Sequence, residues 1–179
     1  MTTTHKSKPR FSASIQSLLP RLADLSLSSA PPPKFFEKLI AELFASLELT
    51  AAAVWMLDGP NTFRLLYDRD LHLLWNDRDP VVSQQNQKLL NDIVHTPDAC
   101  TRPFASTQIS HSDAVFLLPV IRHDACIAIV QLFGPELHLP DNSVDVQPAI
   151  HEIQAVIDTY LERTEAADSG TDPSSYFKD

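Results

Sequence analysis

The stretch Asp113–Gly134, DAVFLLPVIRHDACIAIVQLFG, decides the fold. Its two arms, Ala114–Ile121 and Cys126–Phe133, are rich in β-branched and aromatic residues, which favour strands. The polar Arg122-His123-Asp124 between the two arms is typical of a turn. The stretch therefore predicts a β-hairpin.

Both faces of this hairpin are expected to be apolar, because neither arm alternates between apolar and polar residues. One face of the first arm carries Phe116, Leu118 and Val120, and the other face carries Val115, Leu117 and Ile121. In the second arm, Ala128, Val130 and Leu132 oppose Ile127, Ile129 and Phe133. An antiparallel pair with one wet face alternates, so this hairpin is expected in the middle of a sheet covered on both sides.

Length and composition fit one globular domain with extensions, and a domain of roughly 130 to 150 residues buries about two thirds of its unfolded surface. Of the 179 residues, 14 are Lys or Arg and 23 are Asp or Glu, so the net charge is −9. Such a charge disfavours nucleic acid or an anionic membrane surface as the main partner. No run approaches the ~20 consecutive apolar residues of a membrane span. We expect neither a nucleic-acid nor a membrane partner.

The two ends of the chain are predicted to be extensions of the globular domain. Residues 1–33 predict a flexible Ser- and Pro-rich segment, with a short helix where Ile15, Leu18, Leu19, Leu22 and Leu25 fall at helical spacing. Pro20 interrupts this helix, and the stiff Ser28–Pro33 sets the domain boundary at residue 34. The basic first residues also fit a transit peptide, but a plain disordered head is preferred, in a cytoplasmic protein. Residues 166–179 predict a disordered acidic tail.

Helices and strands alternate between these ends. Apolar stripes predict a leading helix over residues 34–49, a crossover helix starting at Asp79-Pro80, and a closing helix through Ile150, Ile153, Ile157 and Leu161. Strands are predicted at 50–58, 62–67 and 100–106, and a partly buried loop at 71–79. Tight turns make the sheet antiparallel. The expected fold is α+β, with the terminal helices on one face and the crossover helix plus loops on the other.

The segment from Lys34 to Glu165 resembles a GAF domain, a small-molecule sensory module. The resemblance rests on the step Leu118-Pro119-Val120, the turn, the strand Ile127–Leu132 and the long closing helix. It implies a profilin-like sheet and a non-catalytic sensory or regulatory role, binding a small molecule or a protein partner and signalling through the terminal helices. A pure interaction module without ligand is the alternative.

Departures from the GAF pattern narrow the range of ligands that the resemblance implies. Ala128 stands where GAF domains often have Gly. The residue constellation of cyclic-nucleotide-binding members is not present in recognisable order, so a cyclic nucleotide is not expected. Cys100 is followed by Thr-Arg-Pro rather than by the His of bilin-attaching members, so no chromophore is expected. The sequence implies no cofactor.

Gln131 is the most informative polar residue of the hairpin. It is the strongly polar side chain inside the second arm, and a buried amide without a partner costs on the order of 1 to 3 kcal/mol. If the small Ala128 faces the terminal helices, Gln131 faces the loop-covered side, bonded to a loop backbone, water or ligand. The predicted pocket residues on that side are Gln131, Ile127, Ile129, Phe133, Trp75 and Phe104.

A metal site and a thiol-dependent activity are less well supported by the sequence than a sensory role, and no catalytic residue is assigned. His111 with Asp113 and His123 with Asp124 lie at opposite ends of one predicted strand, roughly 27 Å apart, so they cannot share an ion. Cys100 and Cys126 are expected to be reduced core thiols. GAF-type methionine sulfoxide reductases use loop thiols, and this thiol-dependent enzyme is the lower alternative.

The terminal helices predict a homodimer, because their apolar surface is wider than one sheet face needs. The extra width comes from Phe35, Ala149, Val156 and Tyr160, which are the predicted interface residues. The same surface could instead dock residues 12–27 of its own chain.

Overall fold

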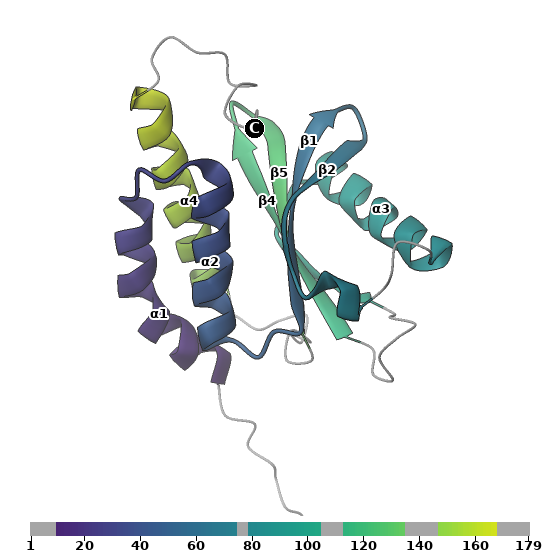
Figure 1. Cartoon of the computed structure of the whole chain (residues 1–179), viewed down its shortest axis with the longest axis horizontal. Coiled ribbons are helices and arrows are strands. Elements are labelled where there is room, and N and C mark those ends of the chain that lie inside the picture. The colour runs from purple at the N-terminus through teal and green to yellow at the C-terminus, as the bar shows by residue number, and fades with distance from the viewer. Residues whose placement is uncertain (1–9, 75–78, 105–112, 135–146, 168–179) are drawn as a thin grey trace, which may run out of the picture.

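The computed structural model describes residues 10–74, 79–104, 113–134 and 147–167, arranged as helices on both faces of one sheet (Figure 1). In chain order the elements are α1 (Arg10–Ser26), α2 (Pro32–Ser46), β1 (Ala51–Gly59), β2 (Thr62–Arg69), the 3-10 helix η1 (Leu71–Leu73), α3 (Pro80–His95), β3 (Cys100–Phe104), β4 (Asp113–Arg122), β5 (Ala125–Gly134) and α4 (Gln147–Ala167). Among the described residues, no helix is long and apolar enough to cross a membrane.

The sheet confirms the predicted hairpin. Its strand order is β2-β1-β5-β4-β3 and the neighbouring strands are antiparallel, so neither β4 nor β5 lies at an edge. The turn between them has two residues, His123 and Asp124, with φ of 49° and 62°. Positive φ at both positions defines a type I′ turn, whose twist matches that of the flanking strands.

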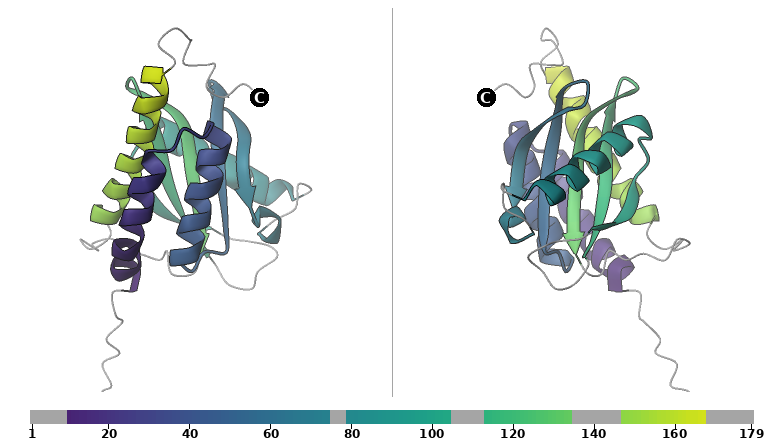
Figure 2. Two further views of the ribbon diagram at one scale, coloured as in Figure 1. Left: turned by 60° about the vertical axis from the view of Figure 1, so that its left-hand side comes forward. Right: turned by 90° about the vertical axis from the view of Figure 1, so that its right-hand side faces the viewer.

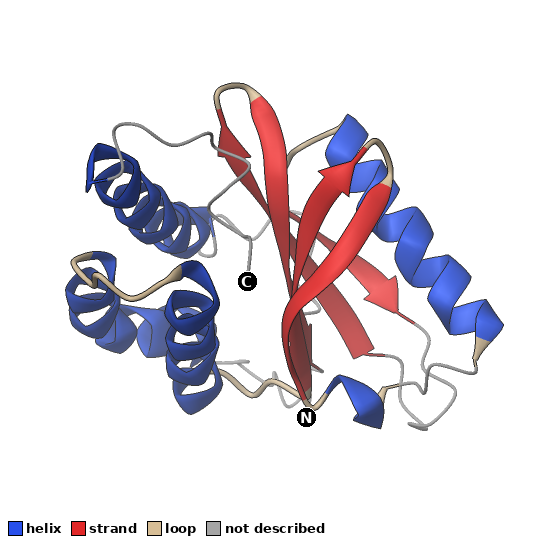
Figure 3. Cartoon of the chain, turned by 45° about the horizontal axis from the view of Figure 1, so that its top comes forward, coloured by secondary structure: helices blue, strands red, loops and turns tan. Residues whose placement is uncertain are grey.

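Helices cover both faces of the sheet, as Figures 2 and 3 show, and this confirms the predicted α+β arrangement. A buried apolar layer lies on each face. The layer under α1, α2 and α4 receives Phe116, Leu118, Val120, Ala128, Val130 and Leu132 from the central hairpin. The layer under α3 and η1 receives Val115, Leu117, Ile129 and Phe133. The small Ala128 does face the terminal helices, so Gln131 lies on the α3 side.

One strand residue is on the other face from the one predicted. Ile127 packs against the layer under the terminal helices, whereas the prediction placed it with Ile129. The cause is a β-bulge: Val120 pairs with Ala128 and Ile121 with Cys126, which leaves Ile127 without a partner position. Two residues then oppose one, and the alternation of faces shifts by one residue.

Helix α1 is longer than the short helix expected within residues 1–33. It runs for 17 residues through Pro20, and its main contacts are with α2 and α4. Leu18 and Leu22 are fully buried. Arg21 also pairs with Glu42 at 2.8 Å. Burying leucines contributes about 1.5 to 3 kcal/mol each, which offsets the ~3 kcal/mol cost of an interior proline.

The predicted dimer interface is largely inside the chain. Phe35 and Tyr160 are fully buried, with their rings stacked at 3.7 Å between centroids, and Val156 is 8% exposed. The side chain of Ala149 lies outside the described part. With α1 in place, these buried side chains are not available to a second copy of the chain, and the homodimer stays a prediction. The alternative, in which the wide surface docks the chain's own N-terminal segment, is what the structure has.

The remaining helices follow their sequence signals. Asp79 caps α3 by accepting hydrogen bonds from the backbone N–H groups of Val81 and Val82, and Pro80 occupies the first turn. Helix α4 ends at Ala167, so the first two residues of the predicted tail are helical. The rest of that tail and residues 1–9 lie outside the described residues.

Candidate functional site

The α3 side of the sheet contains a polar group in the middle of an apolar layer. Gln131 is fully buried on β5, between Ala53 of β1 and Leu117 of β4. Its amide lies under α3, where Asn86 is 4% exposed. Apart from Ser26, which lies in α1, these are the polar side chains buried among the described residues. Among the described residues, the buried layer on the α3 side is therefore apolar except around this amide pair.

Three side chains form a hydrogen-bonded relay across this interface. Trp55 Nε1 of β1 donates to Gln131 Oε1 at 2.5 Å. Gln131 Nε2 then donates to Asn86 Oδ1 of α3 at 2.8 Å. The relay joins β1, β5 and α3, and it satisfies both ends of an amide that would otherwise be expensive to bury.

The sequence interpretation placed Gln131 on the correct face but missed both of its partners. Asn86 occupies the buried stripe of α3, spaced four residues from Val82 and four from Leu90. A polar residue inside an apolar helical stripe is a signal that was available in the sequence. Trp55 pairs with Ile129 across β1 and β5, and this placement depends on strand register, which the sequence does not show.

The other predicted pocket residues divide into three groups. Ile129, Phe133 and Phe104 are fully buried in the layer under α3, where the Phe104 and Phe133 rings meet edge to face with centroids 5.0 Å apart. Ile127 lies on the opposite face, as described above. Trp75 lies outside the described residues.

The two cysteines do not approach one another. Cys100 pairs with Leu117 and Cys126 with Ile121, four residues further along β4 and on its other side. At ~3.3 Å per residue and ~4.8 Å between strands, their Cα atoms are roughly 16 Å apart, well beyond the ~7 Å limit for a disulfide. Cys126 is a free, half-buried thiol. Its Sγ donates to the Ala128 carbonyl oxygen at 3.3 Å.

Burial raises the pKa of the Cys126 thiol to about 11, so roughly one thiol in a thousand is ionised at pH 8. We predict that alkylation of Cys126 by iodoacetamide is slow and rises about tenfold per pH unit from pH 8 to 10. The difference in labelling between the native chain and Cys126→Ala isolates this thiol from Cys100. Labelling that levels off near pH 7 would contradict the burial argument.

No group of three or more His, Cys, Asp or Glu residues that could hold a metal ion is present within the described ranges. His123 lies at the tip of the central hairpin, with its side chain 71% exposed. His111, whose pairing with Asp113 was considered for a metal site and not favoured, lies outside those ranges.

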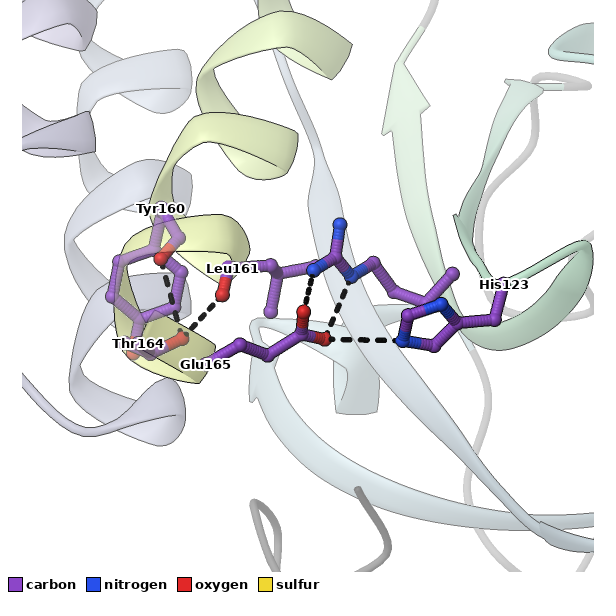
Figure 4. A network of polar contacts seen from close by, with 6 residues as sticks. His123, Tyr160, Leu161, Thr164 and Glu165 are labelled. Carbon is purple, nitrogen blue, oxygen red and sulfur yellow. Dashed lines mark hydrogen bonds and ion pairs between the residues drawn. The ribbon is translucent and has the colours of Figure 1, made fainter. Parts of the chain in front are cut away.

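An ion-pair junction joins the hairpin tip to the last turns of α4 (Figure 4). Arg122 Nε donates to Glu165 Oε1 at 3.0 Å, and its Nη2 pairs with Glu165 Oε2. His123 Nε2 lies 3.8 Å from Glu165 Oε1. Because the Arg122 side chain is only 14% exposed, this bidentate pair is screened less than a surface pair.

The same end of α4 is also tied to the helical layer. The Tyr160 hydroxyl donates at 2.6 Å to the carbonyl oxygen of Ala30, which lies between α1 and α2. Burial raises the pKa of this phenol to about 12, so it remains a donor. The last turns of α4 are thus held by β4 through Arg122 and by the α1–α2 connection through Tyr160.

Comparison with solved structures places this architecture among GAF folds. No protein-family model matches the chain, and no curated protein matches it. The GAF domain of A. aeolicus nlh2 superposes with a TM-score of 0.59 at 9% identity, covering 86% of this chain and 98% of that one. A Burkholderia vietnamiensis protein described as a GAF sensor gives 0.60 at 14% identity, covering 93% and 99%.

A GAF-fold enzyme is also similar. The free methionine-R-sulfoxide reductase from Neisseria meningitidis superposes with a TM-score of 0.65 at 12% identity, covering 93% of this chain and 99% of that one. At such identities the likeness concerns the fold. The chain has a GAF fold, and the resemblance stated from its sequence is confirmed at that level.

Proposed function

We propose that this chain is a sensory or regulatory GAF-like domain that binds a small molecule on the α3 side of its sheet. The carrying observation is the Trp55–Gln131–Asn86 relay inside an otherwise apolar layer. A few convergent polar groups in apolar surroundings are typical of small-molecule sites. The likeness to GAF sensor domains supports the same role.

The output of this domain would run through α4. Gln131 lies on β5, and β5 forms the central hairpin with β4, which ends at Arg122. Arg122 in turn holds Glu165 near the end of α4. A shift of β5 against β4 would therefore reach α4 through a stiff hairpin and a partly buried ion pair, the kind of contiguous network that transmits coupling between sites.

Native mass spectrometry of the full chain after gentle purification tests the binding function. We expect a mass excess from a retained small molecule that disappears on acid denaturation. Gln131→Ala should lose this excess, whereas Gln84→Ala, an exposed position of the same helix as Asn86, should keep it. A chain that carries no bound molecule and self-associates would instead favour the interaction module without ligand.

A thiol-dependent sulfoxide reductase is the second candidate, supported by the fold of the Neisseria meningitidis enzyme. Such chemistry needs a thiolate, and the pKa of Cys126 is raised by burial to about 11. The distance between Cys126 and Cys100 also argues against direct formation of a disulfide between them. The sensory role is therefore preferred.

A further inference from the structure

The relay has a direction, and this direction restricts what can bind beside it. An indole N–H is a donor and has no acceptor capacity. Trp55 therefore requires the oxygen of the Gln131 amide to face it, as the 2.5 Å contact shows. The Gln131 nitrogen must then face Asn86, which places the Asn86 oxygen toward Gln131 at 2.8 Å.

The end of the relay is consequently a donor. With Oδ1 of Asn86 turned to Gln131, its Nδ2 amide group keeps two N–H bonds to offer. Within the described part of the chain, no hydrogen bond from Asn86 Nδ2 to another residue is present, although the side chain is 96% buried, since only 4% is exposed. Nδ2 is not among the described side-chain atoms that are sealed from solvent without a partner, so its N–H bonds are available to an acceptor atom from outside the chain.

The surroundings restrict the charge of that acceptor. The described residues of this layer are aliphatic or aromatic, including Val82, Leu90, Ile129 and Phe133. None of the buried side chains that the structure describes is charged. A carboxylate or phosphate placed here would lose its hydration without gaining a counter-charge, which costs far more than burying a neutral carbonyl.

We propose that the site takes an uncharged, mainly apolar molecule with a hydrogen-bond acceptor such as a carbonyl oxygen, which accepts from Asn86 Nδ2. This inference rests on the proposed binding function and adds the chemical class of its ligand. Zwitterionic amino acids and anionic nucleotides belong to the disfavoured class.

Three probes of one size separate these properties: acetophenone (neutral acceptor), ethylbenzene (same shape, no acceptor) and benzoate (anionic acceptor). Each is titrated into the 15N-labelled full chain, following the Trp55 indole N–H and the Asn86 side-chain amide signals. We expect acetophenone to bind about fivefold more tightly than ethylbenzene, the factor that one net hydrogen bond supplies. It should also bind more tightly than benzoate, whose charge would be buried without a counter-charge. Its binding should shift the Asn86 amide signals more than the Trp55 signal.

The variant Asn86→Leu should reduce the acetophenone-to-ethylbenzene ratio to about one, whereas Gln84→Leu, at an exposed position of α3, should preserve it. The probe series on the native chain decides the matter even if Asn86→Leu does not fold. Equal binding of ethylbenzene and acetophenone would overturn the acceptor preference alone. Tightest binding by benzoate would overturn the neutral class. Binding of none of the three would contradict the proposed function as well.

Discussion

A chain lacking residues 1–27 is expected to lose several kcal/mol of stability and to self-associate. Helix α1 buries Leu18, Leu22 and Leu25 against α2 and α4, and each leucine contributes about 1.5 to 3 kcal/mol. Its removal also leaves Glu42 without the 2.8 Å pair to Arg21. Without α1, the apolar surface of α2 and α4 becomes exposed, and an exposed apolar patch of this kind favours association with a second chain. Sedimentation and thermal unfolding at several concentrations measure both effects.

The matched control for this truncation is a chain lacking residues 1–8, which keeps all of α1. It should sediment as the full chain does and unfold at the same temperature. A chain without residues 1–27 that stays monomeric and as stable as the full chain would show that α1 is dispensable. In that case α1 would not be the cover of the α2–α4 surface.

Replacing Gln131 by Ala is expected to lower the free energy of unfolding by roughly 3 to 5 kcal/mol. The change leaves the Trp55 N–H and the Asn86 oxygen without their partner and opens a cavity in a fully buried place. Urea unfolding of the two chains gives the difference. Gln154→Ala is the control: its Nε2 reaches the Pro119 carbonyl oxygen only at 3.5 Å, so a change below about 0.5 kcal/mol is expected. Similar losses at both positions would refute the relay.

The central hairpin could be predicted because two features of the sequence agree. Its arms are apolar on both faces, which requires an internal position, and the polar His123-Asp124 pair allows the two-residue turn. Ile127 could not be assigned, because a bulge arises from the mismatch between two strands and leaves no trace in the alternation of one strand. The local sequence pattern therefore predicts the hairpin, whereas the pairing of β4 with β5 determines the face on which Ile127 lies.

The length of α1 was underestimated because Pro20 was given its cost in an isolated helix. In the folded chain the helix continues through Pro20, since Leu18 and Leu22 on either side of it are fully buried. The predicted apolar width of α2 and α4 is present, and the chain's own first helix covers it, so this width does not by itself argue for a dimer. A wide apolar stripe on a helix indicates that another element covers it, but does not show whether that element belongs to the same chain or to a second one.

Of the three residues of the relay, the sequence analysis named Gln131 but not Trp55 or Asn86. An amide inside a buried strand requires a partner, and this fixed Gln131 and its face. The partners come from β1 and α3, which meet Gln131 only after the sheet and the crossover helix are assembled. Such contacts between distant segments depend on register and helix placement rather than on local pattern.

Hydrogen exchange of the full chain, measured with and without saturating acetophenone, tests the central claim most directly. The account predicts slower exchange in the segments of β5 and α3 that carry Gln131 and Asn86. It also predicts a change at the end of α4, where Arg122 holds Glu165. Unchanged exchange in β5 and α3, with protection confined to α1 and α2, would contradict it.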